Sequence, residues 1–134
     1  MGKCYYFSTD KETWTASRDA CVAVGGDLVI INTPEEKNFI KRLGTSNKDY
    51  WIGLTDAVKK GDWRWLDGTK LSTRSIYWGE KQPDNRKGTY KEYPGGEDCA
   101  VMGNYYFWDE FCDSMTYKFV CEAKSPIYIR KLND

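Results

Sequence analysis

The acidic and amide side chains between Trp78 and Cys112 are the residues whose types and spacing could do chemistry in this chain. They lie among aromatic residues and two cysteines, and they are Gln82, Asp84, Glu97, Asp98, Asp109 and Glu110. Hard oxygen donors that converge on one place are the ligands that Ca²⁺ prefers. If carboxylates converge without a cation, they repel one another and some must take up protons. The stretch therefore predicts either a metal site or a charged loop.

Histidine is absent from the whole chain, and this removes most of the common catalytic motifs. A Ser-His-Asp triad, a Cys-His pair and an HExxH zinc motif are all excluded. A glycosidase would need two carboxyl groups that flank one bond. Asp109 and Glu110 are neighbours, and neighbouring residues on a strand point to opposite faces. We therefore expect that the protein is not an enzyme.

Length and charge limit the class of protein further. At 134 residues the chain most simply forms one domain, and an aromatic content of 16% favours a packed globule over disorder. The chain has 20 basic and 20 acidic residues, so its formal net charge is zero. This balance does not favour a nucleic acid or an acidic membrane surface as a partner.

Five cysteines in so short a chain suggest an oxidising, extracellular compartment. Cys21, Cys99, Cys112 and Cys121 could form two disulfides, and their spacing alone does not choose among the three ways of pairing them. Cys4 is left over, and we expect its partner to lie upstream of the sequence.

The clearest start of a helix lies at Thr33. Thr33 is a suitable N-cap, Pro34 fits the first helical position, and Glu36 completes a capping box with Thr33. Phe39, Ile40 and Leu43 would form the inner face, which predicts a helix over residues 34–43.

The remaining elements are short. A second helix is expected over residues 12–24, and strands over residues 4–7, 28–31, 50–54, 63–66, 99–102 and 117–121. From about residue 67 to 98 regular signals fade, as in long loops that carry function. Four tryptophans are expected in the core, at positions 51, 63, 65 and 78. This order of elements predicts an α+β fold stapled by disulfides.

Seven pieces of sequence, in this order and spacing, resemble a C-type lectin-like domain over nearly the whole chain. They are CYYFS at 4–8, the helix ending in Cys21, WIGL at 51–54, WRWLDG at 63–68, QPD at 82–84, GGEDC at 95–99 and FVCE at 119–122. The resemblance implies the C-type lectin fold, with two helices, short antiparallel strands and a long loop that binds calcium and sugar. It also implies that residues 1–134 are a single domain trimmed from a longer chain.

The resemblance also implies a disulfide pattern. The bridges would be Cys21–Cys121 and Cys99–Cys112. In longer members of the family, the cysteine that corresponds to Cys4 pairs with one a short way upstream.

Ligands of one Ca²⁺ are implied residue by residue. Gln82 and Asp84 match the first ligand pair, and Glu97 matches the next ligand. The Gln82–Pro83 peptide is cis in members of this family, which would aim Gln82 and Asp84 at one cation. The last ligand pair comes from a W-N-D motif, from which this sequence departs.

The departing motif reads FWDEFC at residues 107–112 and has one residue fewer before its cysteine than usual. Counting back from the cysteine places Trp108 on the ligand Asn and Asp109 on the ligand Asp. Counting from the tryptophan places Asp109 on the Asn and Glu110 on the Asp, and the usual distance from Trp108 to Cys121 favours this second alignment. Asp109 is a candidate ligand in both.

The order Q-P-D resembles the galactose-type lectins, whereas mannose-type members carry E-P-N. Galactose or N-acetylgalactosamine would place two hydroxyls directly on the Ca²⁺, beside Gln82, Asp84, Glu97 and Asp109. Galactose-type members also place a Trp against the apolar face of the sugar, and here Arg86 takes its position. We expect Tyr90 or Tyr93 of the long loop to supply the aromatic ring that packs against the sugar instead.

An auxiliary calcium site occurs in some members. Asp56, Asn85 and Asp98 fall at matching positions, together with Glu97. Lys60 falls where a glutamate ligand is expected. An ammonium group in this position can replace the second cation.

The partners implied are glycans or glycoproteins, and the missing upstream region could form a homo-oligomer. The chain would be secreted or part of the ectodomain of a membrane receptor. An alternative is a calcium-independent member that recognises a protein partner, in which Arg86, Lys87 and Lys91 neutralise the acidic loop.

Overall fold

The computed structural model describes residues 3–43, 49–71, 74–84 and 97–124 of the chain. The two helices of this part are α1 (Trp14–Ala23) and α2 (Pro34–Leu43). The strands are β1 (Cys4–Phe7), β2 (Asp27–Leu28), β3 (Tyr50–Thr55), β4 (Arg64–Trp65), β5 (Cys99–Met102), β6 (Phe107–Glu110) and β7 (Lys118–Ala123). The predicted α+β fold is confirmed.

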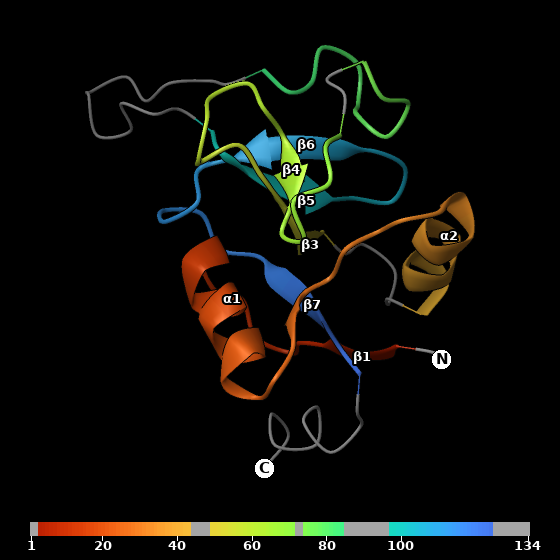
Figure 1. The fold of residues 1–134 in the computed structure, drawn as a ribbon, viewed down its shortest axis with the longest axis vertical. Coiled ribbons are helices and arrows are strands. Elements are labelled where there is room, and N and C mark those ends of the chain that lie inside the picture. The colour runs from red at the N-terminus through yellow and green to blue at the C-terminus, as the bar shows by residue number, and fades with distance from the viewer. Residues whose placement is uncertain (1–2, 44–48, 72–73, 85–96, 125–134) are drawn as a thin grey trace.

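The strands pair in the order β1-β7-β3-β5-β6, with β2 added beside β7 and β4 beside β3. β5 and β6 lie at the opposite end of the molecule from β1, and α1 runs alongside β7 (Figure 1). The pairing of β3 with β7 is parallel, so the expectation of antiparallel strands is wrong at this place. The two strands are far apart in sequence and no hairpin joins them, so nothing forces them to run in opposite directions.

The tryptophans expected in the core are all buried. Trp63 packs edge-on against Trp78, with ring centroids 4.9 Å apart, and Trp78 packs edge-on against Phe107 of β6. An isolated bridge also joins Trp78 to Phe107. The chain that follows Trp78 is thereby held beside β6.

Side-chain bonds tie the start of α2 to β1. The hydroxyl of Thr33 accepts a hydrogen bond from the Glu36 N–H at 3.0 Å, which confirms the predicted N-cap. The Glu36 carboxylate, however, accepts from the Asn32 N–H at 2.8 Å, one residue before the position that a capping box uses. It also accepts from the Tyr5 hydroxyl at 2.6 Å and pairs with the Lys3 ammonium. The Glu36 carboxylate, which a capping box would direct at the Thr33 N–H, is therefore also used to bind Tyr5 of β1 and the preceding Lys3.

The strand predicted over residues 28–31 differs from the structure, and one strand was not predicted. The apolar run at residues 28–31 is buried, but only its first residue belongs to a strand, β2. The Val29 N–H donates to the Val120 carbonyl at 2.9 Å and its carbonyl accepts from the Gly53 N–H at 2.8 Å. This segment therefore bridges β7 and β3 without forming a ladder of its own. β6 was not among the predicted strands.

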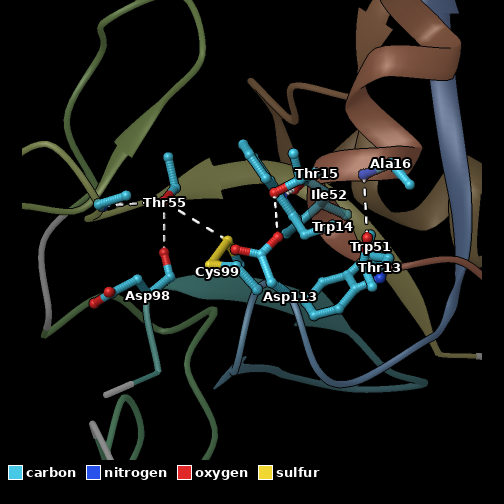
Figure 2. Close-up of a disulfide and its surroundings, with 12 residues drawn as sticks. Thr13, Trp14, Thr15, Ala16, Trp51, Ile52, Thr55, Asp98, Cys99 and Asp113 are labelled. Carbon is cyan, nitrogen blue, oxygen red and sulfur yellow. Dashed lines mark hydrogen bonds between the residues drawn. A yellow bond between two sulfur atoms is a disulfide. The ribbon is translucent and has the colours of Figure 1, made fainter. Parts of the chain in front are cut away.

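The structure confirms both implied disulfides. Cys21–Cys121 joins α1 to β7, and Cys99–Cys112 joins the start of β5 to the turn after β6. Near the second bridge, the Thr15 hydroxyl donates to the Asp113 carboxylate at 2.5 Å (Figure 2). Cys4 is not in a disulfide in this chain, so its upstream partner stays a prediction.

The two disulfides should stabilise the fold to different degrees. Cys21 and Cys121 are 100 residues apart, whereas Cys99 and Cys112 are 13 apart. In the chain-entropy model, replacing the first pair by Ser lowers the free energy of unfolding by about 4–5 kcal/mol and replacing the second pair by about 3 kcal/mol. Urea denaturation measures both, with Cys4→Ser as the control that changes little. A larger loss from the Cys99–Cys112 pair would contradict this account.

Candidate functional site

Three carboxylates form the candidate site. One oxygen each from Asp84, Glu97 and Asp109 lie within 4.8 Å of one another. Glu97 is 3% exposed and Asp109 is 2% exposed, whereas Asp84 faces solvent. Negative groups this close and this buried repel strongly unless a cation or protons neutralise them.

Strand pairing brings two of these carboxylates together. Asp109 lies on β6, where it faces Ala100 of β5 in the antiparallel register. Glu97 stands two residues before β5 begins. The β5–β6 pairing alone therefore sets Glu97 and Asp109 near one another, although they are twelve positions apart in sequence.

The third carboxylate is held by backbone hydrogen bonds. The Gly79 N–H donates to the Phe107 carbonyl at 2.9 Å, so this segment follows the open edge of β6. Further on, the Asp84 N–H donates to Oδ1 of Asp109 at 3.0 Å. This hydrogen bond holds Asp84 next to Asp109 without the help of a ligand.

Gln82 adds an oxygen to the rim of the group. Lys81 turns the chain just before it, with a left-handed φ of 64°, and the Gln82–Pro83 peptide is cis, as the family resemblance implied. The Gln82 amide N–H donates to Oδ2 of Asp84 at 3.4 Å. Its Oε1 is buried and has no hydrogen-bond partner in the described part of the chain. A buried acceptor of this kind is available to a bound water or cation.

This donor set fits Ca²⁺. It consists of oxygen atoms, charged and neutral, with neither sulfur nor imidazole among them. The cluster supplies part of the 6–8 oxygens that Ca²⁺ takes, and this leaves coordination positions for ligand hydroxyls or water.

The shortened motif contributes Asp109 alone to this group. Glu110 lies on the opposite face of β6, where its Oε2 accepts from the Tyr117 hydroxyl at 2.6 Å. Trp108 also faces that side and packs edge-on against Tyr117. The structure therefore does not bring Glu110 to the carboxylates, because alternate residues of a strand face opposite ways. The opposite orientation of Asp109 and Glu110, which argued against a glycosidase pair, is confirmed.

The auxiliary group is built around an ammonium. Lys60 forms a short ion pair with Asp98. Asp56 is buried, and its Oδ2 accepts from the Gly61 N–H at 2.8 Å. The Asp98 carbonyl accepts from the Thr55 hydroxyl at 2.5 Å (Figure 2). The Lys60 ammonium thus lies beside the Asp98 carboxylate. This is the position expected if the ammonium replaces a second calcium ion.

Some predicted residues lie outside the described part of the chain. They are Asn85 of the auxiliary site, Arg86, and the two tyrosines proposed as an aromatic wall, Tyr90 and Tyr93. Their roles stay predictions.

Burial, together with the neighbouring Asp98 carboxylate, raises the pKa of Asp56 to about 6, although Lys60 opposes the shift. Between about pH 4 and pH 6, Asp56 is therefore still protonated in the folded protein but already ionised in the unfolded chain. Stability from this group is therefore full at low pH and declines as the pH rises from about 4 to about 6.

We expect Asp56→Asn to raise the free energy of unfolding in EDTA at pH 7 by about 1 kcal/mol, because the amide stays neutral and can donate to Asp98. Thermal unfolding from pH 4 to pH 7 tests this, and the difference from the unsubstituted protein should shrink toward pH 4. Asp19→Asn on the exposed face of α1 is the control. A difference of the same size at every pH would contradict the assigned pKa.

Comparison with known proteins agrees with this geometry. The sequence model of the Lectin C-type domain matches residues 10–123. The chain belongs to the C-type lectin family. Rat asialoglycoprotein receptor 2 is 39% identical over 128 residues, which cover 94% of this chain and 40% of the receptor. The chain thus spans less than half the length of this curated relative.

Solved C-type lectin structures share the fold. The carbohydrate-recognition domain of the human scavenger receptor C-type lectin superposes with a TM-score of 0.78 at 37% identity, covering 92% of both chains. The trimeric structure of the Kupffer cell receptor Clec4f gives a TM-score of 0.79 at 36% identity, covering 93% of this chain and 80% of that one. The described part of the chain therefore has the fold of a C-type lectin domain.

The disulfides of this C-type lectin domain fit an extracellular, oxidising compartment. Within the residues that the structure describes, no helix has the length and apolarity needed to span a membrane.

Proposed function

We propose that this C-type lectin domain binds glycans through one Ca²⁺, with galactose or N-acetylgalactosamine preferred over mannose. The observation that carries the proposal is the gathering of three carboxylates, two of them buried, at the end of β6. Buried like charges are costly unless a cation or protons neutralise them, and Ca²⁺ is a cation that such oxygen donors favour.

The chain's own residues take distinct parts in this proposal. Asp84, Glu97 and Asp109 supply negative oxygens, and Gln82 supplies a neutral one. A bound Ca²⁺ would offer open coordination positions to two neighbouring sugar hydroxyls, which the same side chains can also hydrogen-bond. Glu110 has no place in this set because its carboxylate faces Tyr117.

The preference for galactose depends on the order of residues 82–84. Gln82 precedes and Asp84 follows the proline, as in galactose-type lectins. The similarity to a receptor for asialoglycoproteins supports the same assignment. Tyr90 or Tyr93 would supply the aromatic wall in place of the tryptophan that Arg86 replaces.

The Ca²⁺ affinity should fall in the range of extracellular modules, with a dissociation constant of about 10⁻⁴–10⁻³ M. The metal requires ionised carboxylates, so acidification should release metal and sugar together. One site of this kind binds a monosaccharide weakly, and several copies on an oligomer would give the biological strength. The trimeric Clec4f structure is a relative that assembles in this way.

Calcium should raise the melting temperature, because it binds only the folded protein, and galactose should raise it further. At a calcium concentration about 100-fold above the dissociation constant, the gain in stability is about 2.7 kcal/mol. Asp109→Asn should lose most of the calcium response, whereas Asp19→Asn should keep it. The measurement is thermal unfolding in calcium and in EDTA, with galactose and mannose.

This unfolding experiment distinguishes calcium-dependent sugar binding from the calcium-independent alternative. If mannose stabilises more than galactose, the assignment from Q-P-D is wrong. If calcium has no effect on the unsubstituted protein, the metal site is refuted and the calcium-independent alternative, with a protein partner, takes its place.

The number of calcium ions tests the role of Lys60. The Lys60 ammonium pairs with Asp98 in the auxiliary group and takes the place of a second cation there. We therefore expect titration calorimetry to give one calcium ion per chain. Lys60→Glu removes the ammonium and adds a carboxylate beside Asp56 and Asp98, and it should create a second calcium site. Lys59→Glu makes the same change of charge on the neighbouring residue and should leave one site. Two ions in the unsubstituted protein would refute the replacement.

A further inference from the structure

A cavity of about 350 Å³ adjoins the carboxylate group, beside the hairpin that joins β5 to β6. Sites for small molecules span about 300–1,000 Å³, so its volume lies within their range. Its lining combines aromatic rings with a few polar groups, among them Asp49, Gln82, Asn104, Tyr105, Tyr106 and Trp108. Of the proposed calcium ligands, Gln82 is the one that also lines this cavity.

Two tyrosines stand exposed at the tip of the hairpin. Tyr105 is 68% exposed and Tyr106 is 55% exposed. Tyrosine rings offer a flat apolar face with a polar edge, and such rings are usual on binding surfaces. Two exposed aromatic side chains beside a cavity therefore point to a ligand with an apolar face and hydroxyl groups.

Helix α2 holds the hairpin in place. The Lys37 ammonium donates to the Tyr105 carbonyl at 2.9 Å, and the Lys41 ammonium lies 4.4 Å from the centroid of the Tyr105 ring. In Figure 1 the hairpin extends toward the side of the molecule where α2 lies. A ligand at the hairpin would meet a surface that is already ordered, which reduces the entropic cost of binding.

Gln82 connects the cavity to the carboxylate group. It lines the cavity, and its amide N–H donates to Asp84 at 3.4 Å. A sugar held by the carboxylates would therefore be able to extend over Gln82 into the cavity.

We propose that this cavity is a subsite for a second, neutral sugar unit, linked to the sugar at the carboxylate group. The inference rests on the proposed function. A tyrosine ring, that of Tyr106 foremost, packs against the apolar face of the second ring, while Asp49 and Asn104 bind its hydroxyls. The Asp49 carboxylate in the lining disfavours an anionic sugar, because it would repel it.

The test compares methyl galactoside with galactose-terminated disaccharides of different linkages, by titration calorimetry in calcium. We expect at least one disaccharide to bind about 3- to 10-fold more tightly than methyl galactoside, as one aromatic packing contact allows. Tyr106→Ala should remove this gain and leave the dissociation constant of methyl galactoside unchanged. Tyr106→Phe, which keeps the ring, should retain most of it.

Ile76→Ala is the matched control, because Ile76 is an exposed apolar residue outside the cavity lining. If no disaccharide gains affinity, or if the gain survives Tyr106→Ala, the subsite is refuted while the calcium site stands. If methyl galactoside itself does not bind, methyl mannoside and mannobioses replace the probes in the same comparison. Failure of both monosaccharides refutes the proposed function, and the subsite with it.

Discussion

The candidate site depends on the antiparallel pairing of β5 with β6. This register sets Asp109 opposite Ala100 and brings Glu97 to the same end of the sheet. It also directs Asp109 and Glu110 to opposite faces, and so it decides that one acidic residue joins the carboxylate group while its neighbour bonds to Tyr117. The Cys99–Cys112 bridge joins the two strands at this same end, opposite the hairpin, and supports that register.

The open edge of β6 is the second support. It receives the segment after Trp78 through the Gly79–Phe107 backbone bond and the packing of Trp78 on Phe107. The segment then delivers Gln82 and Asp84 to the carboxylate group at its end. Its other side faces the hairpin tip, so one short stretch of chain borders both the carboxylates and the aromatic cavity.

Two clusters of acidic residues lie near the start of β5, and we interpret their neutralisation differently. Lys60 is paired with Asp98, so the protein's own side chain supplies a positive charge there. Asp84, Glu97 and Asp109 are close together, and the proposed function assigns their neutralisation to Ca²⁺. An internal ammonium is always present, whereas a metal is exchangeable, so of the two clusters the proposal makes just one responsive to calcium.

The sequence by itself determined the chemistry and the local elements. Oxygen donors without histidine indicated calcium, the residues around Thr33 placed α2 correctly, and the family pattern implied both disulfides and the cis peptide before Pro83. These follow from residue types and short spacings. Only the tertiary structure turned Glu110 away from the carboxylate group, paired Lys60 with Asp98, and set Tyr106 and Gln82 in the lining of one cavity. These facts depend on strand register and on contacts between distant segments, which local sequence does not encode.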